Sequence, residues 1–309
     1  MSVNPDPRPA LTRRFWLHSA LLTGACVAAY AGIRMIPVEP CEFLHYGDFM
    51  TADGVIEECG YEETNFFDMD ALRFPIIARV TPLSDPEVGV ETPMKLTLFS
   101  MQGRPVREAD VAVSHTERVH ALIVDPSLDD YQHIHPAAAG PAGHYTFMFT
   151  PRRAGEHHVY LDFILLTTNR RALVSTTFDV PGAETAGPGS PLSGHYEEDG
   201  LVYTLGSENG PLRAGEDGVI RLRVAPADTK RVKFEPVMGS FAHLVAFQRG
   251  RHGFAHLHPR NPFLRDHDPL DPDLSFAIHL DQPGTYRVWA QVKINGRERI
   301  VPFDLEVSS

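Results

Sequence analysis

The stretch "HALIVDPSLDDYQHIHP", residues 120–136, has the form of two short strands joined by a turn. A second stretch, "HLVAFQRGRHGFAHLHP" at residues 243–259, repeats this form. Each begins with a histidine that stands thirteen positions before a His-x-His-Pro motif, at positions 120 and 133 in the first half and at 243 and 256 in the second. The shared spacing predicts an internal duplication.

The chain from residue 74 onward consists of short β-type runs separated by Gly, Pro, Asn and Asp. Because no run has a helical period over ten or more residues, the pattern predicts an all-β protein. We expect two tandem immunoglobulin- or cupredoxin-like β-sandwich domains, at residues 74–180 and 201–309, joined by a Gly- and Pro-rich linker at 181–200. Among the expected strands are 111–115 in the first domain and 231–238 in the second.

The N-terminal segment predicts a membrane helix. Residues 15–33 contain no Asp, Glu, Lys or Arg, and a helix of that length rises about 28 Å, close to the hydrocarbon thickness of a bilayer. Arginines in residues 1–14 place that end in the cytoplasm, so the rest lies on the periplasmic side of the inner membrane as a single-pass protein. The alternative is a cleaved signal and a soluble periplasmic protein, since "TRRFWL" resembles a twin-arginine signal and "AYA" a cleavage site.

Residues 34–73 fit neither half and are expected to form an irregular lead-in. Cys41 and Cys59 lie within it, and in an oxidising compartment such a pair predicts a disulfide. The alternative is two unpaired thiols. No cysteine follows Cys59, which excludes a blue-copper site from both sandwiches.

The histidines are candidate metal ligands. Residues i and i+2 of a strand share a face, so the two histidines of each His-x-His-Pro motif can hold one ion, and the upstream histidine supplies a third ligand from the neighbouring strand. Three neutral imidazoles suit copper or zinc, and with an ordinary imidazole pKa occupancy is expected to fall below about pH 6. The candidate ligands are His120, His133 and His135 in the first sandwich and His243, His256 and His258 in the second.

Another interpretation of these histidines remains open. His120 shares a strand face with Leu122 and Val124, as His243 does with Val245 and Phe247, so the histidines can instead be core residues that hydrogen-bond to the backbone. Further histidines without a counterpart in the other half are candidates for a fourth ligand. They are His115, His144, His252 and His279.

Composition and the absence of certain motifs argue against several classes of function. A net charge of −12 argues against a nucleic-acid partner. The sequence has no Gly-x-Ser-x-Gly elbow, P-loop or His-Glu-x-x-His helix, so no catalytic residue is assigned and the protein is not expected to be an enzyme.

The two histidine stretches, together with "YRVWAQVKINGRERIVPFDLEV" near the C-terminus, resemble a loosely characterised group of exported bacterial β-sandwich proteins with repeated His-x-His-Pro. The resemblance covers residues 90–307, and it implies heavy-metal or copper handling through the same six histidines.

Three functions compete. The first is a membrane-anchored exported protein that binds copper or zinc at one site in each sandwich. The second is a non-catalytic accessory subunit of a membrane electron-transfer complex, respiratory or photosynthetic. The third is an enzyme like copper–zinc superoxide dismutase, which requires a bridging histidine that no spacing here nominates.

Overall fold

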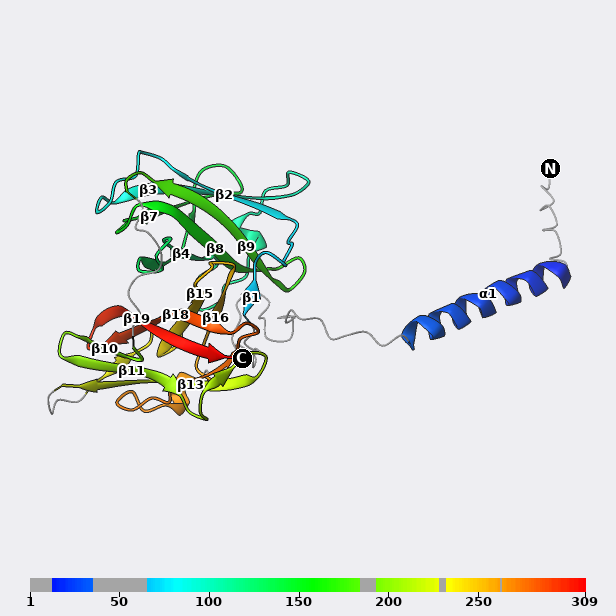
Figure 1. The fold of residues 1–309 in the computed structure, drawn as a ribbon. Helices are drawn as coiled ribbons and strands as arrows, with labels where there is room; N and C mark the ends of the chain where they lie inside the picture. The colour runs from blue at the N-terminus through cyan, green and yellow to red at the C-terminus, as the bar shows by residue number, and fades with distance from the viewer. Residues whose placement is uncertain (1–12, 36–65, 184–192, 228–231, 262) are drawn as a thin grey trace. The chain divides into compact units, whose positions relative to one another are not determined.

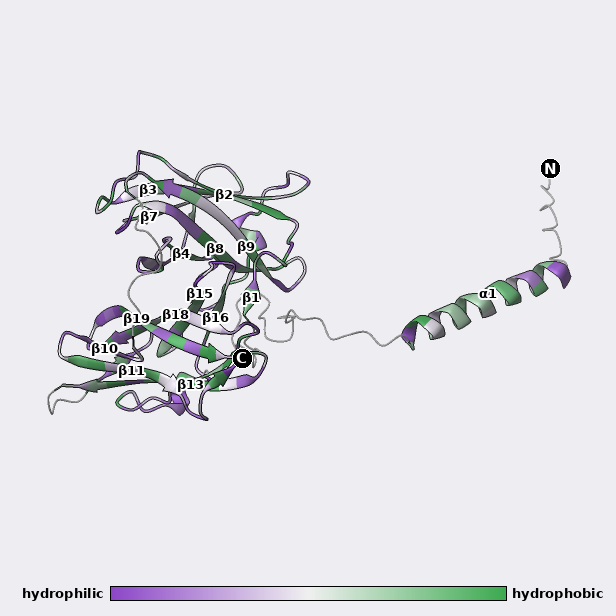
Figure 2. Ribbon diagram, in the orientation of Figure 1, coloured by the Kyte–Doolittle hydropathy of each residue, from purple (hydrophilic) through white to green (hydrophobic). Residues whose placement is uncertain are grey.

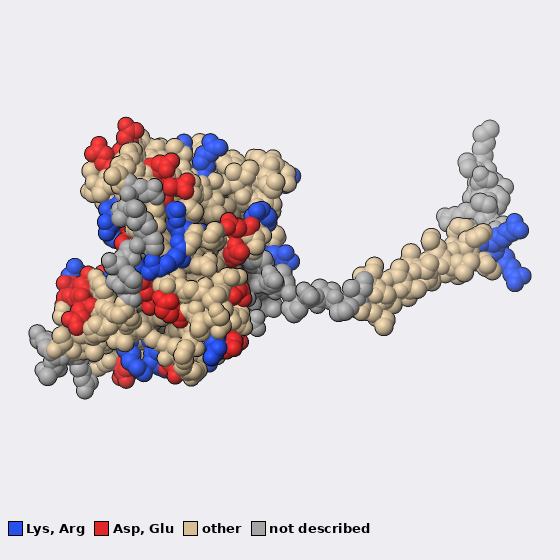
Figure 3. Space-filling view, viewed as in Figure 1, with Lys and Arg blue, Asp and Glu red and all other residues tan. Residues whose placement is uncertain are grey.

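The computed structural model describes residues 13–35, 66–183, 193–227, 232–261 and 263–309. The chain divides into two units, residues 1–42 and 43–309. The first unit contains helix α1 (Arg13–Arg34), which is long and apolar enough to cross a membrane, a test that signal sequences also pass. Arg13 and Arg14 lie at the start of α1, where Figure 3 shows basic side chains, and Arg34 lies in its last turn, where the ribbon is hydrophilic in Figure 2. Cys41 and Cys59 lie outside the described residues.

The first sandwich consists of two four-stranded sheets, with strand orders β2-β3-β7-β6 and β5-β4-β8-β9 (Figure 1). All of their pairings are antiparallel. The elements are β2 (Ile76–Pro82), β3 (Thr92–Ser100), a 3-10 helix (Glu108–Asp110), β4 (His120–Val124), β5 (Tyr131–Ile134), β6 (Ala137–Ala138), β7 (His144–Phe149), β8 (Gly155–Leu165) and β9 (Arg170–Val180).

The second sandwich repeats this plan with a larger inner sheet. One sheet has the order β10-β11-β13-β17, and the other has the order β1-β16-β15-β18-β19-β12 with β14 also paired to β18. The elements are β1 (Phe67–Asp68), β10 (His195–Glu198), β11 (Leu201–Ser207), β12 (Leu212–Arg213), β13 (Asp217–Pro226), β14 (Phe234–Glu235), β15 (Ala242–Gln248), β16 (Gly253–Leu257), a 3-10 helix (Leu264–Asp266), β17 (Ser275–His279), β18 (Gly284–Ile294) and β19 (Arg297–Ser308).

The predicted all-β fold with two sandwiches after an N-terminal helix is confirmed, although two predicted strands are wrong in extent. The segment 111–115 forms isolated bridges at Val111, Val113 and Ser114 in place of a strand, because a tight turn reverses the chain directly after Ser114. In the described part of the segment 231–238, from residue 232 onward, only β14 is a strand, and Val237 pairs with Ser240 around a similar turn.

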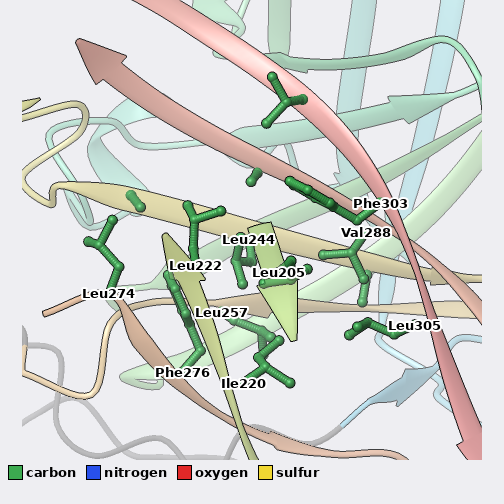
Figure 4. Packing of buried hydrophobic residues seen from close by; sticks show 14 of the residues in the cluster. Leu205, Ile220, Leu222, Leu244, Leu257, Leu274, Phe276, Val288, Phe303 and Leu305 are labelled. Atoms are coloured by element: carbon green, nitrogen blue, oxygen red, sulfur yellow. The ribbon is translucent and has the colours of Figure 1, made fainter. Parts of the chain in front are cut away.

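Each sandwich has its own apolar core between its two sheets. Strand β3 alternates buried and half-buried residues, the pattern of a strand with one face on a core. In the second sandwich, Leu205 and Ile220 of the outer sheet pack with Leu244 and Val288 of the inner sheet (Figure 4).

A third apolar cluster joins the two sandwiches. It brings Leu122 and Tyr160 of the first sandwich together with Phe247, Phe254 and Trp289 of the second. The sheet that contains β4 therefore faces the sheet that contains β15, and the fold has four layers of strands (Figure 1). We call this contact between the two inner sheets the seam.

The seam explains why every residue of β4 is buried and why β15 is buried except for its last residue. Alternate residues of β4, such as Ala121 and Ile123, pack into the core of their own sandwich, whereas Leu122 and Val124 face the other sandwich. By strand alternation, His120 faces the seam too.

Candidate metal centre in the seam

Strand register brings the six candidate histidines to one region of the seam. Leu122 pairs with His133 across β4 and β5, and Leu244 pairs with Leu257 across β15 and β16. If each pairing is continued by one or two residues, His120 lies opposite His135 and His243 lies opposite His258. The thirteen-residue spacing thus predicted the adjacency of the histidines within each half.

The first group consists of His120, His133 and His135. One ring nitrogen from each lies within 4.8 Å of the others. The closest pair is His120 Nδ1 and His133 Nε2, which are 3.1 Å apart. The Nε2 atom of His135 is buried and has no hydrogen-bond partner among the described residues.

Hydrogen bonds fix the tautomers of the two closest rings. His120 Nε2 lies 3.0 Å from the carbonyl oxygen of Ser114, which can only accept, so this nitrogen carries the proton. The side chain of Gln291 donates from Nε2 to Glu298, so its Oε1, 2.9 Å from His133 Nδ1, accepts a hydrogen bond from the N–H of that ring nitrogen. In the neutral rings, His120 Nδ1 and His133 Nε2 therefore face each other, and each carries a lone pair and no proton.

The second group consists of His115, His243 and His258, again with one nitrogen from each within 4.8 Å of the others. His243 is 1% exposed, and both of its ring nitrogens are buried without a hydrogen-bond partner among the described residues. His115 comes from the first sandwich, and its ring stacks on that of His258 at a centroid distance of 3.9 Å. This group therefore draws on both sandwiches.

The remaining histidine of the second half, His256, contacts a carboxylate of the first half. Its Nδ1 lies 3.2 Å from Asp162 Oδ2, and Asp162 in turn accepts two hydrogen bonds from Arg171. This contact mirrors the contact of His133 with Gln291 in the opposite direction across the seam. Asp162 and Gln291 occupy matching places, opposite His120 and His243 in their respective sheets.

Burial keeps these rings neutral. It lowers the pKa of His115 to about 3 and that of His135 to about 4. For the other rings burial is again the largest cause, with neighbouring histidines adding to it, and the pKa lies well below 6.5. These are His120, His133, His243 and His258. Neutral imidazole is the protonation state that a metal requires.

The arrangement differs from the expected one in two respects. The sequence predicts one site within each sandwich, whereas the structure places both groups in the seam and sets His115 where His256 was expected. The sequence also predicts proton competition below about pH 6, whereas the lowered pKa values move that competition to more acidic pH. Both differences arise because the histidine-bearing faces are covered by the other sandwich.

The polar partners Asp162 and Gln291 are not among the residues that the sequence singles out. A signal was nevertheless present, because "VYLDF" at 159–163 and "VWAQV" at 288–292 each place one polar residue at the same position of an apolar strand. Such a residue is buried in both halves here. Of the four suggested extra ligands, only His115 lies in either histidine group.

Comparison with known proteins gives one match at the level of a family. The family described as a domain of unknown function, DUF8832, matches residues 78–181 and 196–309, well over half of the chain. No curated protein matches the chain.

Solved structures show only distant likeness. The adhesin FdeC of Escherichia coli is 14% identical over 75% of this chain and 64% of its own, with a TM-score of 0.23. The fibronectin(III)-like modules of Clostridium thermocellum CbhA are 13% identical over 74% of this chain and 95% of theirs, with a TM-score of 0.19. The chain spans less than two thirds of the adhesin, and scores this low carry no functional argument. The match to both sandwiches shows that the chain belongs to the DUF8832 family.

Proposed function

We propose that the protein binds a copper or zinc ion through His120, His133 and His135 in the seam. The observation that carries this proposal is the 3.1 Å approach of two imidazole nitrogens whose protons are already committed elsewhere. Two lone pairs at this distance repel each other unless a positive charge lies beside them. That charge is either a proton or a metal ion.

A metal ion accounts for more of the geometry than a proton does. A shared proton would satisfy the two facing nitrogens and leave the buried Nε2 of His135 without a partner. In a tetrahedral site with metal–nitrogen bonds of about 2.0–2.1 Å, neighbouring ligand nitrogens are about 3.3 Å apart, close to the spacing found here. The contacts of His120 with Ser114 and of His133 with Gln291 are the outer hydrogen bonds that orient ligating imidazoles.

The chemistry of the ligands indicates which metal ions suit the site. Calcium and magnesium prefer oxygen ligands, whereas imidazole suits copper and zinc. Asp162, a buried carboxylate that contacts His256, is already paired with Arg171. A divalent ion therefore adds two uncompensated charges to a buried site, and on charge alone the site favours the cuprous ion over zinc.

The setting that we propose for this site is outside the cytoplasm, with α1 as a membrane anchor on the periplasmic side. The length of α1 and the arginines at its start support this placement. The resemblance to exported proteins with repeated His-x-His-Pro favours the same setting. Retention of the chain in carbonate-washed membranes tests the anchor, and a soluble protein that has lost α1 would contradict it.

The metal site is tested on the full chain, purified in detergent, stripped with a chelator and titrated with zinc or with cuprous copper. The double variant His133→Ala/His135→Ala should lose the ion at this site. The control His144→Ala, a half-buried histidine of the same sandwich that lies in neither histidine group, should keep it.

Circular dichroism shows whether each variant is folded. A folded double variant with unchanged metal content would return these histidines to a structural role. The accessory-subunit hypothesis would then be preferred.

A further inference from the structure

We infer that His115, His243 and His258 form a second metal site, one that is shared between the two sandwiches and exists only while they are docked. The inference rests on the chemistry of the proposed function, since both groups offer neutral imidazoles. The second site differs from the first in the origin of its ligands. The first group comes from one sandwich, whereas the second comes from both.

The buried state of His243 is the first observation. The centroid of its ring lies 4.9 Å from that of His258 and 5.6 Å from that of His115. The angles between the ring planes are 90° and 86°, respectively. Both nitrogens of His243 and the Nε2 atom of His258 are buried without hydrogen-bond partners in the described part of the chain. Native proteins rarely leave buried polar atoms unpaired, and an ion among these rings would satisfy one nitrogen of each.

The backbone at His115 is the second observation. Ser114 and Glu117 exchange two backbone hydrogen bonds around His115 and Thr116, whose φ angles are 52° and 70°. Left-handed backbone at two successive non-glycine residues is uncommon, and such conformations cluster at functional sites. This tight turn places the His115 ring in contact with rings of the other sandwich.

The same turn serves both groups. The carbonyl of Ser114 accepts the hydrogen bond that orients His120 of the first group, and the next residue, His115, belongs to the second. A cavity of about 10 Å³, lined by Ser114 and His115 of the first sandwich and by His256 and His258 of the second, lies beside the turn. It is therefore bounded by both sandwiches.

A shared site couples metal binding to docking. An ion that binds only when both sandwiches supply ligands stabilises the docked state over any separated one. We therefore expect metal to slow amide hydrogen exchange on both sides of the seam at once, in the turn at 114–117 and in β16.

The test compares metal stoichiometry and amide exchange in three versions of the full chain. His115→Asn removes the imidazole and keeps a residue that tolerates left-handed backbone. Thr116→Asn is the matched control, since it alters the neighbouring residue of the same turn. The wild type and the control should bind two ions, and His115→Asn should bind one and lose at least tenfold in affinity for the second. In that variant metal should no longer slow exchange in β16.

The outcomes separate this inference from the proposed function. A wild type with one ion, lost in His133→Ala/His135→Ala and kept in His115→Asn, would overturn the second site and leave the first intact. Two ions in His115→Asn would also overturn it, and a wild type without any metal would overturn both sites. If His115→Asn does not fold, His115→Gly, which removes the ring at no backbone cost, decides the matter in the same way.

Discussion

The two halves of the seam use matching strands and yet give their middle histidines different partners. His133 donates to the neutral amide of Gln291, whereas His256 contacts the carboxylate of Asp162. A carboxylate stabilises positive charge on the ring beside it, and an amide oxygen does so far less. Both contacts cross between the sandwiches, so His133 meets a neutral acceptor of the second sandwich, whereas His256 meets a carboxylate of the first that is itself paired with Arg171.

Lowering the pH tests a property that the two halves share, the burial of neutral histidines. We expect it to have the largest effect on stability. The pKa of an imidazole is about 6.5 in the unfolded chain, and in the folded chain it is about 3 for His115 and about 4 for His135. Between these values the unfolded chain binds more protons, so the free energy of unfolding of the metal-free protein falls as the pH decreases. Each such histidine contributes up to about 1.4 kcal/mol per pH unit.

Urea unfolding of the metal-free chain at pH 7, 6, 5 and 4 measures this loss. The variant His115→Asn should show a shallower pH dependence than the wild type because it has one buried imidazole fewer. Equal stability at pH 7 and pH 4 would show that these rings are exposed to solvent, and higher stability at pH 4 would show that they are paired with acidic groups.

The two polar partners should differ in their contribution to stability. Asp162→Ala leaves the guanidinium of Arg171 buried without its carboxylate, and the loss of one member of a buried ion pair costs about 3–5 kcal/mol. Gln291→Ala removes the hydrogen bonds of an uncharged side chain to His133 and Glu298 and should cost about 1–3 kcal/mol. Chemical unfolding of both variants measures the two losses. Equal losses would remove the distinction drawn between the halves.

The smallest expected effect concerns the two matching turns. The turn of the second half has Met238 and Gly239 at the positions that His115 and Thr116 occupy in the first, all with positive φ. Thr116→Gly gives the first turn the glycine of the second and should raise the free energy of unfolding by about 1 kcal/mol. Thermal unfolding measures the gain, and metal content should stay unchanged. A destabilised variant would mean that the Thr116 side chain is needed in the turn.

Sequence periodicity predicted much of the fold and identified which residues share a strand face. His120, Leu122 and Val124 do lie on one face of β4, as expected. Periodicity did not indicate what that face contacts, because an apolar strand face has the same pattern whether it covers its own core or another domain. The seam was therefore missed, and with it the positions of Asp162 and Gln291.

The membership of the histidine groups was harder still to predict. His115 reaches its group from a turn and not from a strand, so no strand period predicts where its ring lies. Its left-handed backbone also lacks the usual glycine or asparagine signal for such a turn. Only the three-dimensional position of the turn relates His115 to the other half.

The contacts across the seam are reciprocal, because the histidine of each half binds the residue that lies at the equivalent strand position in the other. Reciprocal contacts of this kind define the two-fold interface of a homodimer, in which each subunit offers the same surface. Here both subunits are parts of one polypeptide. In a true homodimer a substitution alters both copies together, whereas in a fused pair each copy can change by itself. The fusion allows the first half to have Asp162 where the second has Gln291, and His115 where the second has Met238.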